Sequence, residues 1–397
     1  RHQLLIHEMD INAGRYLDGE AMETLAAESV DLLVATASGR KTKGEHAGHS
    51  QVSLWRNWRQ TDTSRLAELR ARIAPDGVPL PFRPAAHAAG YSNPVALRVS
   101  AGTDGRPATE RVALVLPTSL CATQIARLAA ERLNQKGLGR AQGITRFVGF
   151  THTEGCGFGG DTMYQLLQRT YRGSLTHPNV VAALLLEHGC EKVPNDIMRR
   201  QLEAAGVPLA RFGWASVQLD GGIEKALAKI EAWFAERFAA LPAAAEETAN
   251  FRGITVGLMS AGAMSAATAA AFATIASTVL HDGGSVLLPE NDPLLADATF
   301  RESVLGPTVP RATLAYGQPL VKPGLHIVST ESSHWVENAT GLAGCGAHVV
   351  LGLVVDNAQQ GHPMIPVVQV AETTARGRIA GDDIDAFLSG HAPTDTA

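Results

Sequence analysis

The chain contains a series of largely apolar runs, and each of them ends at a polar loop. The clearest three are residues 112–117, 144–150 and 180–186. A short apolar run of this kind is typical of a parallel strand that is buried on both faces. Parallel strands need a crossover segment between them, which is usually a helix. The pattern therefore restricts the fold to the α/β class.

Segments with helical spacing of apolar residues alternate with these runs, as the crossovers require. Residues 120–133 form the first such segment and residues 223–238 the second. Residues 241–250, which are rich in Ala and Glu, are expected to be a linker. After the linker the alternation returns, so a second α/β domain is predicted. Its expected helix is 264–280, and the remaining predicted strands of the chain are 212–219, 254–259, 285–288, 312–316, 325–328, 349–355 and 366–370.

The predicted architecture is thus two parallel-sheet α/β domains, residues 96–240 and 252–397, preceded by a mostly helical segment. In that segment, residues 1–60, apolar side chains recur at helical spacing over 20–35. The stretch between, residues 61–95, ends in a proline-rich sequence and is expected to be a linker.

Composition excludes several classes of protein. With 45% hydrophobic residues, 18% charged residues and a net charge of −5, the chain has the composition of a soluble globular protein. It has no long basic run and only 5% aromatic residues, so a nucleic-acid partner is not expected. Its apolar stretches are interrupted well before the roughly 18 residues of a membrane helix. Four cysteines in 397 residues do not make a disulfide framework, and no signal peptide is recognised, so a cytoplasmic location is expected.

Two polar loops that follow predicted strands hold the best candidate ligands. The first, THTEGCGFGGD, carries His152 and Cys156, and the second, EHGCEK, carries Cys190 and Glu191. Because parallel strands end at one edge of a sheet, both loops are expected to face one cleft. Histidine and cysteine suit a soft metal ion. However, two ligands do not make a site and no CxxC or HExxH motif is present, so ordinary loop residues remain the alternative.

A third candidate is the turn PTSLC, between residues 112–117 and the helix that follows. Ser119 is predicted to cap that helix, whose free N–H groups could bind a substrate carboxylate. A plain capped helix is the alternative. Cys121 is either a thiolate activated by the helix start or a buried, unreactive thiol.

Polar residues also follow the strands of the predicted second domain. Glu290 and Asn291 come after 285–288, and His334 follows 325–328. His334 stands next to Trp335 and is either an acid/base residue or a histidine satisfied by a main-chain partner. The repeated placement of polar residues at one end of the strands predicts a functional face.

Five motifs, taken in order, resemble the altronate/galactarate dehydratase family. They are RVALVLPTSLC, THTEGCG, THPNVVAALLLEHGCEK, FGWASVQLDGG and GGSVLLPEND. The later segments GLHIVSTESSHWVENATGLAGCGAHVV and GHPMIPVVQV resemble the family's carboxyl-terminal domain. Members of this family are metal-dependent, typically iron-dependent, hydro-lyases that act on sugar acids.

Two features depart from the usual family pattern. Residues 1–60, with EMDINAG and ASGRKTKGEHAGHS, resemble the tail that normally ends the family's chains, yet here they come first. The chain therefore resembles the second half of a long, duplicated member, preceded by the end of the first copy. In addition, residues 259–268, MSAGAMSAAT, contain no cysteine where the family usually has a Cys-, Gly- and Ser-rich loop.

The resemblance implies a lyase that dehydrates a sugar acid such as altronate or galactarate to a 2-keto-3-deoxy acid. The implied cofactor is a divalent metal, Fe²⁺ with Mn²⁺ as the alternative, and the implied partners are the sugar acid and either a second copy of the chain or a preceding copy of the same domain. A catalytically degenerate half that only binds a ligand or partner is the alternative function. The expected catalytic residues are His152, Glu191, Glu290 and His334; the expected substrate-binding residues are Thr118, Ser119, Cys121, Thr153, Lys192 and Asn291; and the expected metal ligands are His152, Cys156 and Cys190.

Overall fold

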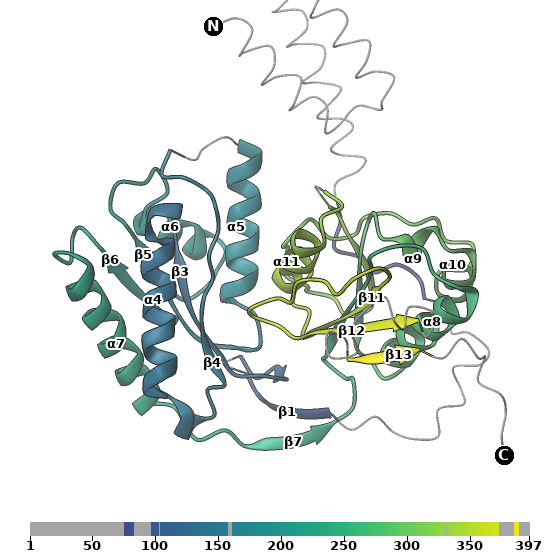
Figure 1. Cartoon of the computed structure of the whole chain (residues 1–397), viewed down its shortest axis with the longest axis horizontal. Helices are drawn as coiled ribbons and strands as arrows, with labels where there is room; N and C mark the ends of the chain where they lie inside the picture. The colour runs from purple at the N-terminus through teal and green to yellow at the C-terminus, as the bar shows by residue number, and fades with distance from the viewer. Residues whose placement is uncertain are drawn as a thin grey trace, which may run out of the picture. The chain divides into compact units, whose positions relative to one another are not determined.

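The computed structural model describes residues 75–82, 97–102, 104–157, 161–330, 332–372 and 385–388. All of them fall in one compact unit, Pro75–Ala397 (Figure 1). The predicted helical segment 1–60, with its expected helix at 20–35, and most of the predicted linker 61–95 lie outside the described residues.

A four-stranded parallel sheet forms the first α/β domain. Its strands are β3 (Val112–Pro117), β4 (Arg146–Gly149), β5 (Val180–Glu187) and β6 (Phe212–Ser216), and their order across the sheet is β4-β3-β5-β6. Every neighbouring pair is parallel. All eight residues of β5 and all six of β3 are buried, as continuous apolar strands covered on both faces require.

Helices cover both faces of this sheet, because successive side chains of each strand point to opposite sides. Val112 and Leu114 of β3 belong to one hydrophobic core, and Ala113 and Val115 belong to another. The second core is completed by α4 (Leu120–Lys136) and α7 (Ile223–Ala239), and the first by α5 (Asp161–Leu175) and α6 (Asn195–Ala204).

The strand order sets where a ligand can bind. From β3 the chain crosses to β4 on one side, and it then returns to β5 on the other side of β3. The loops that leave the carboxyl ends of β3 and β5 therefore lead to helices on opposite faces of the sheet, and ligands of open α/β sheets commonly bind at such a point. The turn with Thr118 to Cys121 leaves β3, and the loop with His188 to Glu191 leaves β5.

A six-stranded parallel sheet forms the second α/β domain, with the order β10-β9-β8-β11-β12-β13. Successive strands are added on one side of β8 as far as β10 and then on its other side from β11 onward, so the strand order reverses between β8 and β11. The strands are β8 (Thr255–Ser260), β9 (Ser285–Pro289), β10 (Leu325–Val328), β11 (Val349–Val354), β12 (Val367–Glu372) and β13 (Ala386–Leu388); the helices are α8 (Ala266–His281), α9 (Pro293–Ala296), α10 (Ala298–Val304) and α11 (Trp335–Cys345). The predicted class, two parallel-sheet α/β domains, is confirmed.

Two predictions of local structure are wrong. The expected strand at 312–316 contributes only an isolated bridge between Leu314 and Val328. The expected linker at 241–250 contains strand β7 (Glu246–Ala249), which pairs antiparallel with β1 (Leu97–Ala101) in a small sheet completed by β2 (Pro107–Ala108). Most of β7 is exposed, so main-chain pairing rather than burial of apolar side chains defines it.

The two α/β domains share one hydrophobic core. That core contains Leu114 of β3 and Tyr171 of α5 together with Leu342 of α11 and Val350 of β11. Helices α5 and α11 pack directly against each other, as Figure 1 shows. The core residues at this contact are buried.

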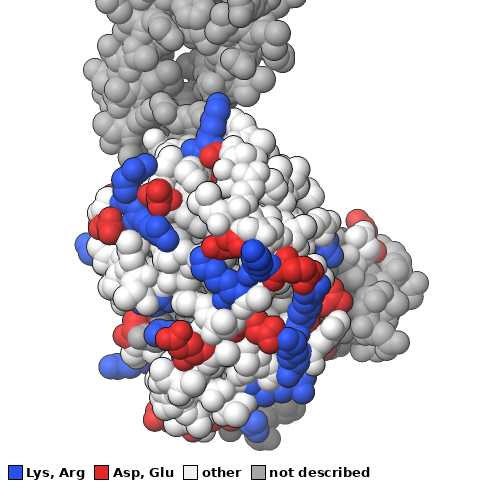
Figure 2. Space-filling model, turned by 90° about the vertical axis from the view of Figure 1, so that its left-hand side faces the viewer, with Lys and Arg blue, Asp and Glu red and all other residues white. Residues whose placement is uncertain are grey.

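None of the helices in the described part of the chain is both long and apolar enough to cross a membrane. On the face shown in Figure 2, Lys and Arg alternate with Asp and Glu without a large area of one sign. Ion pairs such as Arg132 with Glu224 and Lys136 with Glu231 join α4 to α7.

Candidate functional site

The carboxylate of Glu191 organises the loop that follows β5. Its two oxygens accept the N–H groups of His188, Gly189 and Cys190 at 2.7, 2.6 and 2.8 Å. Gly189 has φ +117°, a conformation that glycine adopts more readily than other residues. Burial alone would raise the pKa of the Glu191 carboxyl, but these N–H donors outweigh it and lower the pKa. Glu191 is therefore an ionised, buried anchor.

The same carboxylate binds the turn after β3. The hydroxyls of Thr118 and Ser119 donate to Oε1 of Glu191 at 2.8 and 3.1 Å. Ser119 does occupy the N-cap position of α4, but its side chain makes no capping hydrogen bond. The turn predicted to bind a substrate carboxylate thus binds the protein's own carboxylate, and both hydroxyls are already engaged.

His152 is also held by main-chain groups. Its Nε2 lies 3.0 Å from the carbonyl oxygen of Pro117, and its Nδ1 lies 3.0 Å from the N–H of Glu154. These partners require a neutral ring with the proton on Nε2. Burial lowers the pKa of His152, in agreement with the neutral form. Neither ring nitrogen is free to bind a metal ion in this arrangement.

Main-chain hydrogen bonds join the loop after β4 to the other two loops. The N–H of Leu120, at the start of α4, donates to the carbonyl oxygen of Glu154 at 2.6 Å. The N–H of Lys192 donates to the carbonyl oxygen of Cys156 at 3.0 Å. Three loops that are far apart in the sequence are therefore joined into one structure at the carboxyl end of the sheet.

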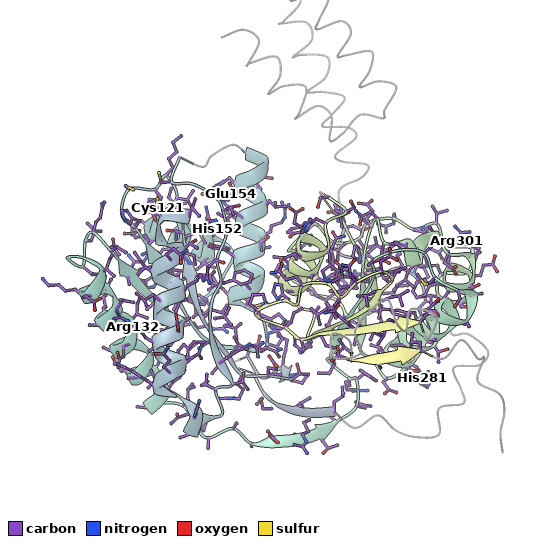
Figure 3. All side chains as sticks on the ribbon, viewed as in Figure 1. Cys121, Arg132, His152, Glu154, His281 and Arg301 are labelled. Atoms are coloured by element: carbon purple, nitrogen blue, oxygen red, sulfur yellow. The ribbon has the colours of Figure 1, made fainter. Side chains whose placement is uncertain are left out.

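Two of the three cysteine side chains near this junction come together, those of Cys156 and Cys190. Cys190 hydrogen-bonds with Cys156 and interacts electrostatically with Cys121. Its sulfur also lies 3.4 Å from Nδ1 of His188. Desolvation, followed by the neighbouring Cys156 thiol and the Glu191 carboxylate, raises the pKa of Cys190. Figure 3 shows Cys121 near His152 and Glu154 at one end of the first domain. We call Cys121, Cys156 and Cys190 the thiol corner.

The predicted metal ligands His152, Cys156 and Cys190 are brought together only in part. Cys156 and Cys190 do come together as predicted, but His152 is engaged with the main chain. Within the described part of the chain, no three His, Cys, Asp or Glu side chains are arranged to hold a single metal ion. The sulfurs are free thiols, and Cys121 and Cys190 are exposed. A metal bound here would contact sulfur first and would displace thiol protons.

Two further predicted residues lie beside the thiol corner. Thr153 and Lys192 are exposed, and each is within a few residues of one of the cysteines. The Lys192 side chain is free to approach an anionic ligand, since only its main-chain N–H is used to join the loops.

The other predicted residues lie at the carboxyl ends of β9 and β10 in the second sheet. Asn291 donates to the carbonyl oxygen of Ser332 at 2.7 Å and accepts from Asn338 at 3.2 Å. His334 is exposed and precedes α11. Glu290 reaches solvent, yet partial burial raises the pKa of its carboxyl. These residues form a second polar group, separate in sequence from the thiol corner.

Asp292 has a structural role that its neighbours lack. It is buried and accepts the N–H groups of Ser260 and Leu294 at 2.9 and 3.0 Å, so it joins β8 to the start of α9. Burial raises the pKa of Asp292 to about 7. The sequence signal for this role is Asp292 followed by Pro293, which is a common start of a helix.

Sequence reasoning missed the contact of His188 with Cys190 and the place of Cys121 at the same edge of the sheet. It treated Cys121 as a substrate contact and did not assign His188. The available signal was that three cysteines each follow a separate buried strand, so that a parallel sheet must bring them to one edge.

Comparisons with known proteins agree with the family resemblance. Residues 102–240 match the family model described as D-galactarate dehydratase/altronate hydrolase, second domain. Residues 2–60 match the model described as D-galactarate/altronate dehydratase, C-terminal. The C-terminal match thus precedes the second-domain match in this chain. No curated protein matches the chain.

Proposed function

We propose that this chain, which carries the second domain and the C-terminal region of the D-galactarate dehydratase/altronate hydrolase family, is a metal-dependent hydro-lyase of a sugar acid. Altronate and galactarate are the substrates that the family description favours. The product would be a 2-keto-3-deoxy acid. The observation that carries the proposal is that the family match spans all three loops at the carboxyl end of the first sheet.

Dehydration of a sugar acid has three chemical requirements. A base must remove the weakly acidic proton next to the carboxylate, a positive charge must stabilise the enediolate that forms, and a proton must reach the departing β-hydroxyl. The enol that results then tautomerises to the keto acid. A divalent cation supplies the positive charge without a proton transfer.

The cation would be held by Cys156 and Cys190, because thiolates are strong ligands for iron and zinc. Lys192 and Thr153, both exposed beside these cysteines, are proposed to contact the substrate carboxylate and hydroxyls. Glu191 is instead a positioning residue, since both of its oxygens are saturated by the protein.

Proton transfer is proposed for Glu290 and His334. Burial raises the pKa of the Glu290 carboxyl, which is the direction that favours a carboxyl able to give up a proton to a ligand. His334 is exposed, so its ring can reach a ligand. Asn291 is proposed to bind a substrate hydroxyl. His152, whose nitrogens are bound to the main chain, is proposed to hold the turn after β3 in place.

The proposal is tested by a turnover assay on the full chain. The protein is purified without oxygen, supplied with Fe²⁺ or Mn²⁺, and offered a panel of aldonic and aldaric acids, and 2-keto-3-deoxy product is measured. We expect product from at least one acid in the family's substrate class. Sugar-acid binding without product would support the alternative of a degenerate, ligand-binding half.

All four cysteines are free thiols, so we propose a reducing cytoplasm as the protein's location.

A further inference from the structure

An open groove of about 740 Å³ lies at the edge of the first sheet. It is lined by α4, where Arg127 and Glu131 are four residues apart on one face of the helix, and by the edge strand β4. The second domain lines it with the segment 361–367, whose Pro363 carbonyl oxygen accepts the Nε–H of Arg146 at 3.0 Å (Figure 1). This volume is typical of sites for small organic molecules. We call this cavity the edge groove.

The main chain of β4 is already paired at the edge groove. The side-chain amide of Asn134 accepts the N–H of Phe147 at 2.7 Å and donates to the carbonyl oxygen of Phe147 at 2.9 Å. A neighbouring strand would make bonds of this kind. A peptide strand therefore cannot pair with β4 at Phe147, and the edge groove is better suited to a small molecule.

One buried donor in the lining of the edge groove has no acceptor. His362 is 9% exposed, and its Nδ1 accepts the N–H of Met364 at 3.3 Å, so the proton of the neutral ring is on Nε2. Nε2 is buried and makes no hydrogen bond with the described residues. An unpaired buried N–H is rare and destabilising, because the group loses its hydrogen bond to water on folding. It points to an acceptor that a ligand supplies.

The electrostatics at His362 favour an anionic acceptor. Burial, followed by the charge of Arg146, lowers the pKa of His362 to about 4, so the ring is neutral at pH 7 and its Nε2 remains a donor. The Arg146 guanidinium is held beside the groove by Glu110, at 2.7 Å, and by the carbonyl oxygen of Pro363. An acceptor at Nε2 is thus close to a fixed positive charge.

The helix side of the edge groove adds a second positive charge. Arg127 is exposed and forms no ion pair with the described residues. Of the two carboxylates in the lining, Glu110 is paired with Arg146, and Glu131 accepts the Nε2–H of Gln135 at 3.3 Å. Between these polar groups the lining is apolar and includes Ala130, Val148, Ile365 and Val367.

We propose that the edge groove binds a small organic carboxylate with an apolar body. The carboxylate accepts the Nε2–H of His362 and lies near the guanidinium of Arg146, Arg127 contributes charge from α4, and the apolar body lies against Val148 and Ile365. None of the residues that line the groove belongs to the loops with Cys121, Cys156 or Cys190. This is therefore a second ligand site, and it is independent of the proposed reaction.

Hexanoate is the probe, and hexanamide, which has nearly the same shape without the charge, is the matched neutral compound. Binding of each to the full chain is measured by ligand-observed NMR. We expect hexanoate to bind and hexanamide to bind at least about 10-fold more weakly, because hydrogen bonds to a charged group are stronger than those to a neutral one.

Two variants remove the polar contacts of the edge groove. His362→Phe keeps an aromatic ring but has no donor, and Arg127→Gln removes an exposed charge that the fold does not use. Each should weaken hexanoate binding about 10-fold, since each removes one charge-assisted contact. Arg140→Gln, an exposed position outside the groove, is the matched control and should bind as the wild type does.

Three outcomes would overturn the proposal. They are equal binding of hexanoate and hexanamide, no binding of hexanoate to the wild type, and hexanoate binding that is unchanged in both groove variants. A loss of binding in Lys192→Gln with none in Arg127→Gln would place the carboxylate at the loop after β5 instead. Sugar-acid turnover is assayed separately, so failure of the edge groove and failure of the proposed reaction are distinguishable.

Discussion

A buried carboxylate is stable in a protein only when its charge is compensated, and Glu191 shows how this is done without a cation. Three N–H groups and two hydroxyls donate to its oxygens. Each hydrogen bond to a charged group contributes roughly 1.5–3 kcal/mol. The carboxylate in turn fixes the two loops that carry Cys121 and Cys190. In the proposed function, Glu191 therefore acts indirectly, through the positions of the thiols.

Glu191→Gln should weaken the thiol corner without removing a ligand. The amide NH₂ of glutamine would face N–H donors at one oxygen position, so at least one donor is left unpaired. We expect metal affinity to fall by about 10–100-fold, as for other residues that orient ligands. Glu236→Gln, on the exposed side of α7, is the control and should bind metal as the wild type does. Equal metal affinity in both variants would contradict the positioning role.

The positions of the candidate residues could be predicted from the sequence, but their hydrogen bonds could not. Cys156 and Cys190 come together because each follows a buried strand of one parallel sheet. Glu191 and His152 have the same placement, yet their polar atoms are used by the protein itself. Their partners include Thr118 and Pro117, dozens of residues away, and no local pattern specifies such contacts.

At the scale of elements, a strand could be predicted from the sequence when its side chains are buried and apolar. Strands such as β5, apolar except for Glu187 at its end, could be predicted to within a residue or two. Strand β7 could not, because its side chains are mostly polar and its only structural signal is the pairing with β1. Contacts between helices are equally hard to predict from the sequence. Helices α5 and α11 approach each other at Gly173 and Gly344, and the close approach is possible because neither residue has a side chain.

Gly173→Ala should separate these two helices. A Cβ at Gly173 would overlap the main-chain carbonyl of Gly344, and backbone cannot move aside as a side chain can. Alanine favours a helix over glycine by about 1 kcal/mol, but overpacking typically costs about 1–3 kcal/mol. We therefore expect a lower free energy of unfolding, measured in urea. Gly361→Ala, where a Cβ meets nothing within 4 Å, is the control. A variant of Gly173 as stable as the wild type would show that the helices are not in close contact.

At the scale of the whole described unit, the two sheets are joined across a contact that contains buried histidines. His177 of the first domain lies 2.9 Å from the carbonyl oxygen of Ala347, and His348 of the second lies 2.9 Å from that of Pro107. Their rings are 5.7 Å apart. Each Nδ1 accepts a main-chain N–H, so both rings are neutral. Protonation of either ring would break a hydrogen bond and bury an unpaired charge.

This contact should make the protein less stable in acid. Burial, followed by the neighbouring His348, lowers the pKa of His177 from 6.5 to about 3, and burial lowers that of His348 to about 4. Below pH 6.5 the unfolded chain therefore binds more protons than the folded chain does. The free energy of unfolding that these neutral histidines contribute is fully present above pH 6.5 and is lost as the pH falls toward the pKa values of the folded state. A single pKa lowered this far corresponds to a loss on the order of 3–5 kcal/mol.

The test separates these histidines from the carboxylates, which also titrate in acid. The free energy of unfolding is measured from about pH 7 to about pH 4 for the wild type and for His348→Asn, which keeps an acceptor for Thr255 but cannot titrate. We expect the variant to be less stable at neutral pH and to lose less stability on acidification. His281→Asn, at the exposed end of α8, should follow the wild-type curve. Parallel curves for wild type and His348→Asn would mean that the domain contact does not depend on a neutral histidine.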